Sequence, residues 1–165
     1  MMKTLTAVAV VLAASISMAQ AGAPDKNFTD PNANESFIAQ IGNNNDAVAL
    51  QAGGNNAQAT IQIANHQPNN QHNTAITLQD NDGKASNAAL TVQLGPNNFA
   101  LTGQTGREGE NTSLIFQGSD AFSTQTGNTA FVFQRSGDAN HGGDLHNTSG
   151  VVQLGHGNVA FVAQK

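Results

Sequence analysis

The chain has 165 residues, a formal charge of −5, no cysteine, tryptophan or tyrosine, and only 10% charged residues. Its length suits one domain, the missing cysteines exclude disulfide bonds, and the acidic balance argues against a nucleic-acid-binding surface, which needs clustered Lys and Arg. With so few large side chains, an ordinary globular core would bury little apolar area.

The first 21 residues predict a secretory signal peptide. Lys3 supplies the positive start, residues 5–16 form an apolar run too short to span a bilayer, and residues 19–21 (Ala-Gln-Ala) have the pattern of a cleavage site. A membrane anchor or a buried helix is the alternative, which the length and flanks of the run disfavour. Residues 22–33, rich in Pro, Asn and Asp, are then expected to form a flexible segment of an exported chain.

From residue 34 onward the chain repeats one pattern, Asn-x-(Ala/Ser)-x-x-x-Gln, ten times. The copies begin at Asn34, Asn45, Asn56, Asn73, Asn87, Asn98, Asn111, Asn128, Asn147 and Asn158. They end at Gln40, Gln51, Gln62, Gln79, Gln93, Gln104, Gln117, Gln134, Gln153 and Gln164. Only one copy departs from the pattern, with Gln58 at the small-residue position. Such self-similarity predicts a stacked repeat architecture.

Each copy predicts one β-strand. Seven extended residues span about 23 Å, and their side chains alternate between two faces. One face carries the Asn, Ala/Ser and Gln positions, and the other carries most of the Phe, Val, Leu and Ile. Several copies are joined by Gln-x-Gly-x-x-Asn, with glycines at Gly42, Gly53, Gly95 and Gly155. These predict tight turns, because Gly and Asn tolerate positive φ.

Pairing consecutive strands predicts an all-β fold, a two-sheet β-solenoid of about five coils within residues 34–165. The coils are expected at 34–51, 56–79, 87–104, 111–134 and 147–164, with insertions at 64–72, 80–86 and 135–146. An antiparallel meander is the alternative, but it would not require the same residue at the same offset in every strand. Coils stacked at a rise of about 4.8 Å would place identical amides in hydrogen-bonded ladders, as in cross-β packing.

The buried face is a choice between two sets of side chains. Apolar area alone favours the bulkier set. We expect the Asn and Gln set inside instead, because repeated amides satisfy one another only when they stack away from water. That arrangement exposes much apolar surface and predicts lateral association. The last copy ends one residue before Lys165, so both end coils are expected to be uncapped and to favour head-to-tail addition.

The repeat resembles that of curli fibre subunits, Ser/Asn-x5-Gln-x-Gly-x-x-Asn-x-Ala-x-x-x-Gln, which residues 34–51, 87–104 and 147–164 match throughout. The resemblance implies an extracellular functional amyloid of a Gram-negative bacterium, used in adhesion and biofilm matrix. It implies export through a dedicated outer-membrane pore, with residues 22–33 as the targeting segment, and polymerisation with itself and with a related subunit or nucleator. Whether the chain resembles the major subunit or the nucleator stays open; curli subunits usually carry Tyr, which is absent here.

The resemblance also implies that three acidic residues slow premature assembly, together with loop glycines. These residues are Asp46, Asp120 and Asp138.

Other motifs carry little chemistry. His141, Asp144 and His146 fit no standard metal-ligand spacing, and the Asp80-x-Asp82 segment lacks the glutamate of a calcium loop. We expect no metal, no cofactor and no catalytic residue. The rival function is that of a monomeric secreted solenoid that binds ice or carbohydrate. An ice binder needs a regular Thr array; Thr77, Thr91 and Thr102 share one parity, but other copies carry Ile, Ala or Val at that position.

Overall fold

The computed structural model describes residues 34–42, 44–64, 72–82, 85–107, 109–119, 127–137 and 146–165. The predicted signal peptide and targeting segment lie outside these residues, as do Asp120, Asp138, His141 and Asp144. The strands are β1 (Glu35–Ile41), β2 (Asn45–Ala52), β3 (Asn56–Ile63), β4 (Asn73–Asn81), β5 (Ser86–Leu94), β6 (Phe99–Gly106), β7 (Glu110–Gly118), β8 (Thr129–Arg135), β9 (Asn147–Leu154) and β10 (Val159–Gln164). Within the described ranges no helix is long and apolar enough to cross a membrane.

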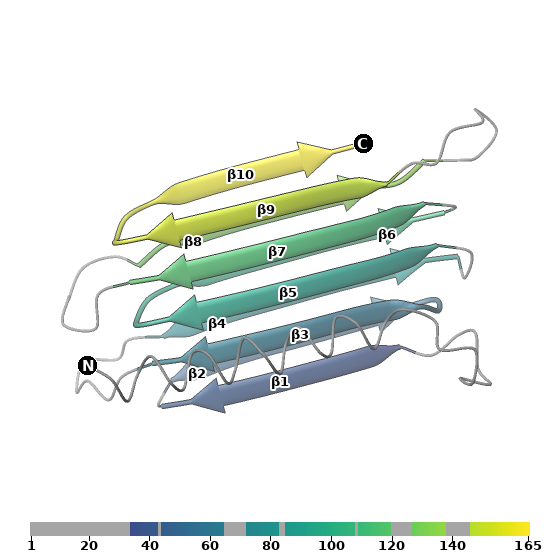
Figure 1. The fold of residues 1–165 in the computed structure, drawn as a ribbon. Coiled ribbons are helices and arrows are strands. Elements are labelled where there is room, and N and C mark those ends of the chain that lie inside the picture. Colours follow the sequence, from purple (N-terminus) through teal and green to yellow (C-terminus); the bar gives the residue numbers. More distant parts are fainter. Residues whose placement is uncertain are drawn as a thin grey trace.

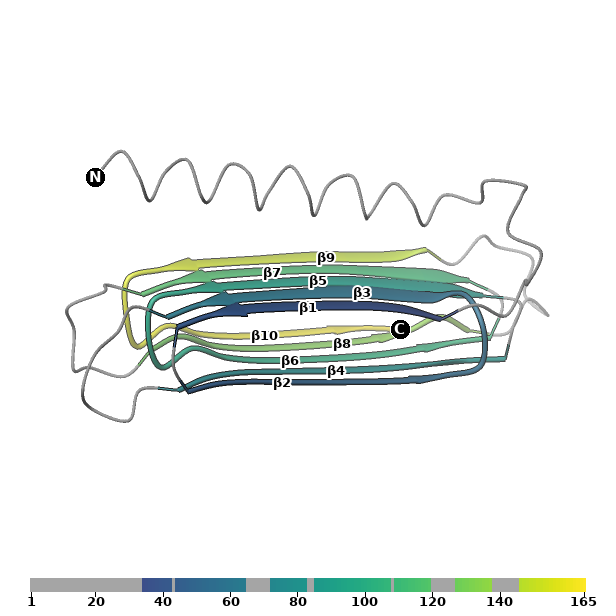
Figure 2. The ribbon, with the colours of Figure 1, turned by 90° about the horizontal axis from the view of Figure 1, so that it is seen from below.

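Successive strands alternate between two parallel sheets (Figures 1 and 2). One sheet has the order β1-β3-β5-β7-β9 and the other β2-β4-β6-β8-β10, and every neighbouring pair is parallel. The chain therefore winds as five coils of two strands each. This confirms the predicted two-sheet β-solenoid, and the antiparallel meander is wrong.

The pairing register places each position of the repeat above the same position in the next coil. β3 pairs with β5 through Asn56↔Asn87 and Gln62↔Gln93. Nine residues separate β3 from β4, yet β4 still pairs with β2 through Asn45↔Asn73. The insertions therefore lengthen the connections without shifting the stacked positions.

The interior is thin and is lined by the amide face of every strand. Its apolar centre is a cluster of small and branched side chains around Ile115 and Val132, both fully buried. Small interior residues such as Ala100 and Ala130, packed in that cluster, keep the two sheets close together. The expected inward set is thus the buried one.

The bulkier set faces outward and is largely solvent-exposed. Leu50 is 61% exposed, Val152 67% and Phe161 67%. Two members of this set, Ile61 and Val92, are instead buried, at 3% each. The outer faces of both sheets thus carry an apolar surface larger than scattered single residues would produce.

The four predicted turn glycines all have positive φ, between 74° and 98°. A Cβ on Gly53 would lie 1.7 Å from the carbonyl oxygen of Asn81 in the next coil, so the turn and the stacking both require glycine there. A second residue of each turn, Asn44, Asn55, Asn97 or Gly157, also has positive φ. The Gln-x-Gly-x-x-Asn spacing therefore describes a turn with two left-handed residues.

Candidate functional site: amide ladders and open coil ends

The ten glutamines that end the repeats form two unbroken ladders, one in each sheet. In each step the Nε2 of one glutamine donates to the Oε1 of the glutamine in the next coil, at 2.7–2.9 Å. One ladder consists of Gln40, Gln62, Gln93, Gln117 and Gln153. The other consists of Gln51, Gln79, Gln104, Gln134 and Gln164. All five coils take part in both ladders.

Each glutamine also joins the two sheets. The Nε2 of Gln93 donates to the backbone oxygen of Thr74, at 3.0 Å, and that of Gln104 donates to the backbone oxygen of Ala88, at 3.0 Å. One amide hydrogen thus points along the stack and the other points across it. This use of both hydrogens satisfies amides that are otherwise fully buried.

The asparagines form two further ladders that run the opposite way. The Nδ2 of each asparagine donates to the Oδ1 of the asparagine in the preceding coil, at 2.8–3.3 Å. One ladder consists of Asn34, Asn56, Asn87, Asn111 and Asn147. The other consists of Asn45, Asn73, Asn98, Asn128 and Asn158.

Backbone groups determine these directions. The Nε2 of Gln117 faces the carbonyl oxygen of Phe99, which can only accept, so the amide cannot be turned around. The Oδ1 of Asn98 likewise accepts from the backbone N–H of Asn128. Glutamine donors therefore point towards β9 and β10, and asparagine donors point towards β1 and β2.

Three side chains outside the repeat also bind the ladders at the corners. Asn81 donates to the Oδ1 of Asn56, and Asn98 and Asn111 approach the hydroxyls of Ser119 and Ser136, at 3.2 and 3.4 Å. The sequence pattern missed these residues. The sequence feature that could have identified them is their position: each lies two residues after a repeat glutamine, where the tight turns have Gly.

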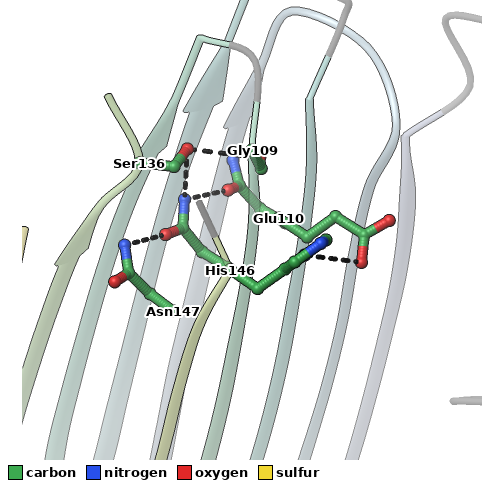
Figure 3. A network of polar contacts seen from close by, with 7 residues as sticks. Gly109, Glu110, Ser136, His146 and Asn147 are labelled. Carbon is green, nitrogen blue, oxygen red and sulfur yellow. Dashed lines mark hydrogen bonds and ion pairs between the residues drawn. The ribbon is translucent and has the colours of Figure 1, made fainter. Parts of the chain in front are cut away.

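Figure 3 shows the corner where β7 and β9 begin. Asn147 continues the asparagine ladder there, and Ser136 donates to the carbonyl oxygen of Gly109, at 3.2 Å. Beside it, the Nδ1 of His146 lies 3.4 Å from the Oε2 of Glu110. Both of these side chains are more than half exposed, so the pair contributes little to stability.

Among the described residues, the ladders end at β1 and β2, which we call the lower end, and at β9 and β10, which we call the upper end. These strands are the outermost members of their sheets. At the upper end, Gln153 and Gln164 donate to the backbone oxygens of Thr129 and Thr148, which uses one amide hydrogen of each. An inner glutamine uses its second hydrogen for the next coil, so here that hydrogen is directed out of the end.

The lower end has the matching polarity. Gln40 and Gln51 donate into the stack, so their Oε1 atoms face outward, where an inner glutamine would accept from the coil below. Asn34 and Asn45 lie at the donor end of the asparagine ladders.

The remaining predicted residues fall on the surface or in the core. Asp46 and Asp80 are exposed on β2 and β4. Thr77, Thr91 and Thr102 are at most 2% exposed, so they do not form a surface array of the kind that binds ice. Among the described residues, no three or more His, Asp or Glu side chains form a group that could hold a metal ion.

Comparison with family models, with curated proteins and with solved structures gives no match for this chain. The resemblance to curli subunits therefore stays a prediction from the repeat.

Proposed function

We propose that this chain is the subunit of an extracellular fibre that grows by head-to-tail stacking of copies. The observation that carries the proposal is the complementarity of the two coil ends. At a junction, Gln153 and Gln164 of one copy would donate to Gln40 and Gln51 of the next. In return, Asn34 and Asn45 of the added copy would donate to Asn147 and Asn158. All four ladders would continue without a break.

The backbone supports the same junction. β1 and β9 run in the same direction within one sheet, as do β2 and β10 within the other, so stacking copies would extend both sheets as parallel sheets. Open parallel edges of matching geometry favour an interface that does not close on itself, and such an interface produces a filament.

Gly155 offers a further match at the upper end. Its equivalents Gly42, Gly53 and Gly95 each have a carbonyl oxygen of the following coil within 2.2 Å of the Cβ position. At Gly155 the nearest atom is 3.9 Å away, yet φ is again positive. This turn thus has the form that accommodates a following coil.

The cellular setting rests on the residues outside the described ranges and on the resemblance. A signal peptide and an exported targeting segment would deliver the chain to an outer-membrane pore. Copies would then assemble on the surface of a Gram-negative cell, starting from a nucleator or a related subunit. The fibre would serve adhesion and biofilm matrix as a curli-like amyloid.

The first test is assembly of the purified chain from Gly22 onward. We expect thioflavin-positive fibres after a lag, and abolition of the lag by preformed seeds. A chain that stays monomeric for days at tens of micromolar would contradict the proposal.

The second test uses the polarity of the ends. Gln164→Leu leaves the lower end intact, so the variant should add to the upper tip of a seed and then block further addition. A small fraction of this variant in wild-type monomer should therefore slow seeded growth. The control is Val152→Thr, an outward-facing change on the same end coil, which should not slow it. Equal effects of the two variants would count against the junction.

A further inference from the structure

The outer face of the second sheet has a groove that crosses its strands. Its floor is the outward position just before each glutamine, where Leu50, Leu78, Gly103 and Phe133 follow one another from β2 to β8. A Cβ on Gly103 would lie 2.9 Å from the Phe133 ring, so that ring leans over the gap left by the glycine. The floor of the groove is thus a row of apolar residues that is lowest at Gly103, on the central strand β6.

Two opposite charges border this groove at equal distances from its centre. Asp80 on β4 and Arg135 on β8 occupy the same outward position after the glutamine, and both are exposed. They lie one strand below and one strand above Thr105 on β6. Two strand spacings, about 9.6 Å, separate their backbones, and the two side chains form no ion pair with each other within one copy.

We propose that this face pairs with the same face of a second copy, about a two-fold axis that runs along β6. The rotation keeps each residue at its position along the strand and exchanges β4 with β8. Asp80 then faces Arg135 of the second copy, and Arg135 faces Asp80. Thr105, on the axis, faces its own equivalent. The two copies stack in opposite directions along the fibre axis.

The sizes of the facing side chains support this pairing. Three Phe side chains lie on the upper strands, where the rings of Phe131 and Phe161 are 6.5 Å apart and those of Phe133 and Phe161 are 5.9 Å apart. The rotation sets them against the smaller side chains of β2 and β4, such as Leu78 opposite Phe133. Large residues therefore meet smaller ones at both ends of the face.

The other face-to-face arrangement is less favourable. A two-fold axis along the stack would keep each strand on its own level and reverse its direction. Asp80 would then face Thr74, and Arg135 would face Thr129, which leaves both charges without a partner. Such an interface gives up two charge pairs, so complementarity favours the axis along β6.

The available area suffices for a weak interface. Five strands at about 4.8 Å spacing and about 23 Å length give each copy a face of about 550 Å², or about 1,100 Å² in total. That value clears the roughly 1,000 Å² expected of a biological interface and lies below the roughly 1,200–2,000 Å² of stable complexes, so it fits a weak interface. The inference goes beyond the proposed function, because it concerns a sheet face and not the coil ends.

The test is self-cross-linking of single-cysteine variants with a short bis-maleimide, which the cysteine-free chain permits. Thr105→Cys should give covalent dimers. Ala52→Cys, at the same outward position on the end strand β2, should not, because its equivalents would lie about 19 Å apart. Thr112→Cys, exposed on the other sheet, should not either. In copies stacked end to end, the two Thr105 residues would lie about 24 Å apart, which a short cross-linker cannot span. A covalent dimer through this position therefore reports face-to-face pairing.

Charge reversal tests the orientation. In the Thr105→Cys chain, Asp80→Arg should lower the dimer yield at low salt about three- to tenfold, because two like-charged pairs replace two opposite ones. Adding Arg135→Asp should restore the yield. The proposal is overturned if Thr105→Cys links no better than Thr112→Cys, or if the double reversal performs no better than the single one. Neither outcome depends on whether fibres form.

Discussion

Replacing an inner glutamine tests whether the ladders stabilise the monomer. Gln93 is fully buried and makes three hydrogen bonds: it accepts from Gln62 at 2.7 Å and donates to Gln117 at 2.9 Å and to the backbone of Thr74 at 3.0 Å. In Gln93→Leu the new side chain has a similar volume, and all three hydrogen bonds are lost. Two acceptors, the side chain of Gln117 and the backbone of Thr74, and one donor hydrogen of Gln62 are then left buried without their partner.

The expected cost follows from these orphaned groups. Each buried polar group that loses its partner costs about 1–3 kcal/mol, and burying the leucine side chain offsets part of the sum. We expect Gln93→Leu to lower the free energy of unfolding by about 2–4 kcal/mol. Urea denaturation followed by circular dichroism, at concentrations below those that give fibres, measures this quantity.

The matched control introduces the same residue on the outside. Thr112→Leu lies on exposed surface and should change the free energy of unfolding by less than about 0.5 kcal/mol. If Gln93→Leu were as stable as this control, the ladder bonds would contribute nothing net, and the stacking would have to rest on apolar packing and backbone pairing alone.

Three further predictions concern turns, buried charge and the surface. Gly53→Ala should lower the free energy of unfolding by more than about 1 kcal/mol, because its Cβ would strike the carbonyl of Asn81, whereas Gly150→Ala, with open space around it, should be tolerated in the same urea assay. Gln93→Glu should be most stable at low pH and lose stability as the pH rises above about 4.3, because burial disfavours the charged carboxylate; a pH series of melts checks this. Glu110→Gln should shift stability by less than about 0.5 kcal/mol, because its ion pair is exposed.

The repeat pattern predicted the architecture because every strand carries the residues that fix its pairing register. Asn at the start and Gln at the end define the limits of the strand, its inward face and the strand on which it stacks. The long-range pairing therefore follows from the local pattern. Burial of the amide set also followed from physics, since ten equivalent amides can satisfy one another only by stacking.

The pattern did not predict what depends on three-dimensional detail. The corner roles of Asn81, Ser119 and Ser136 depend on which turn lies above which, and that is decided by the lengths of the connections. The directions of the ladders depend on the backbone carbonyl that each amide meets. Burial of Ile61 and Val92 on the outward face has no counterpart in the alternation of the sequence.

The opposed directions of the two kinds of ladder have an electrostatic consequence. In an α-helix, aligned peptide dipoles add up and leave partial charges at the termini. Here the side-chain dipoles of each glutamine column are countered by those of an asparagine column in the same sheet. Lengthening such a rod therefore adds no net side-chain amide dipole along its axis.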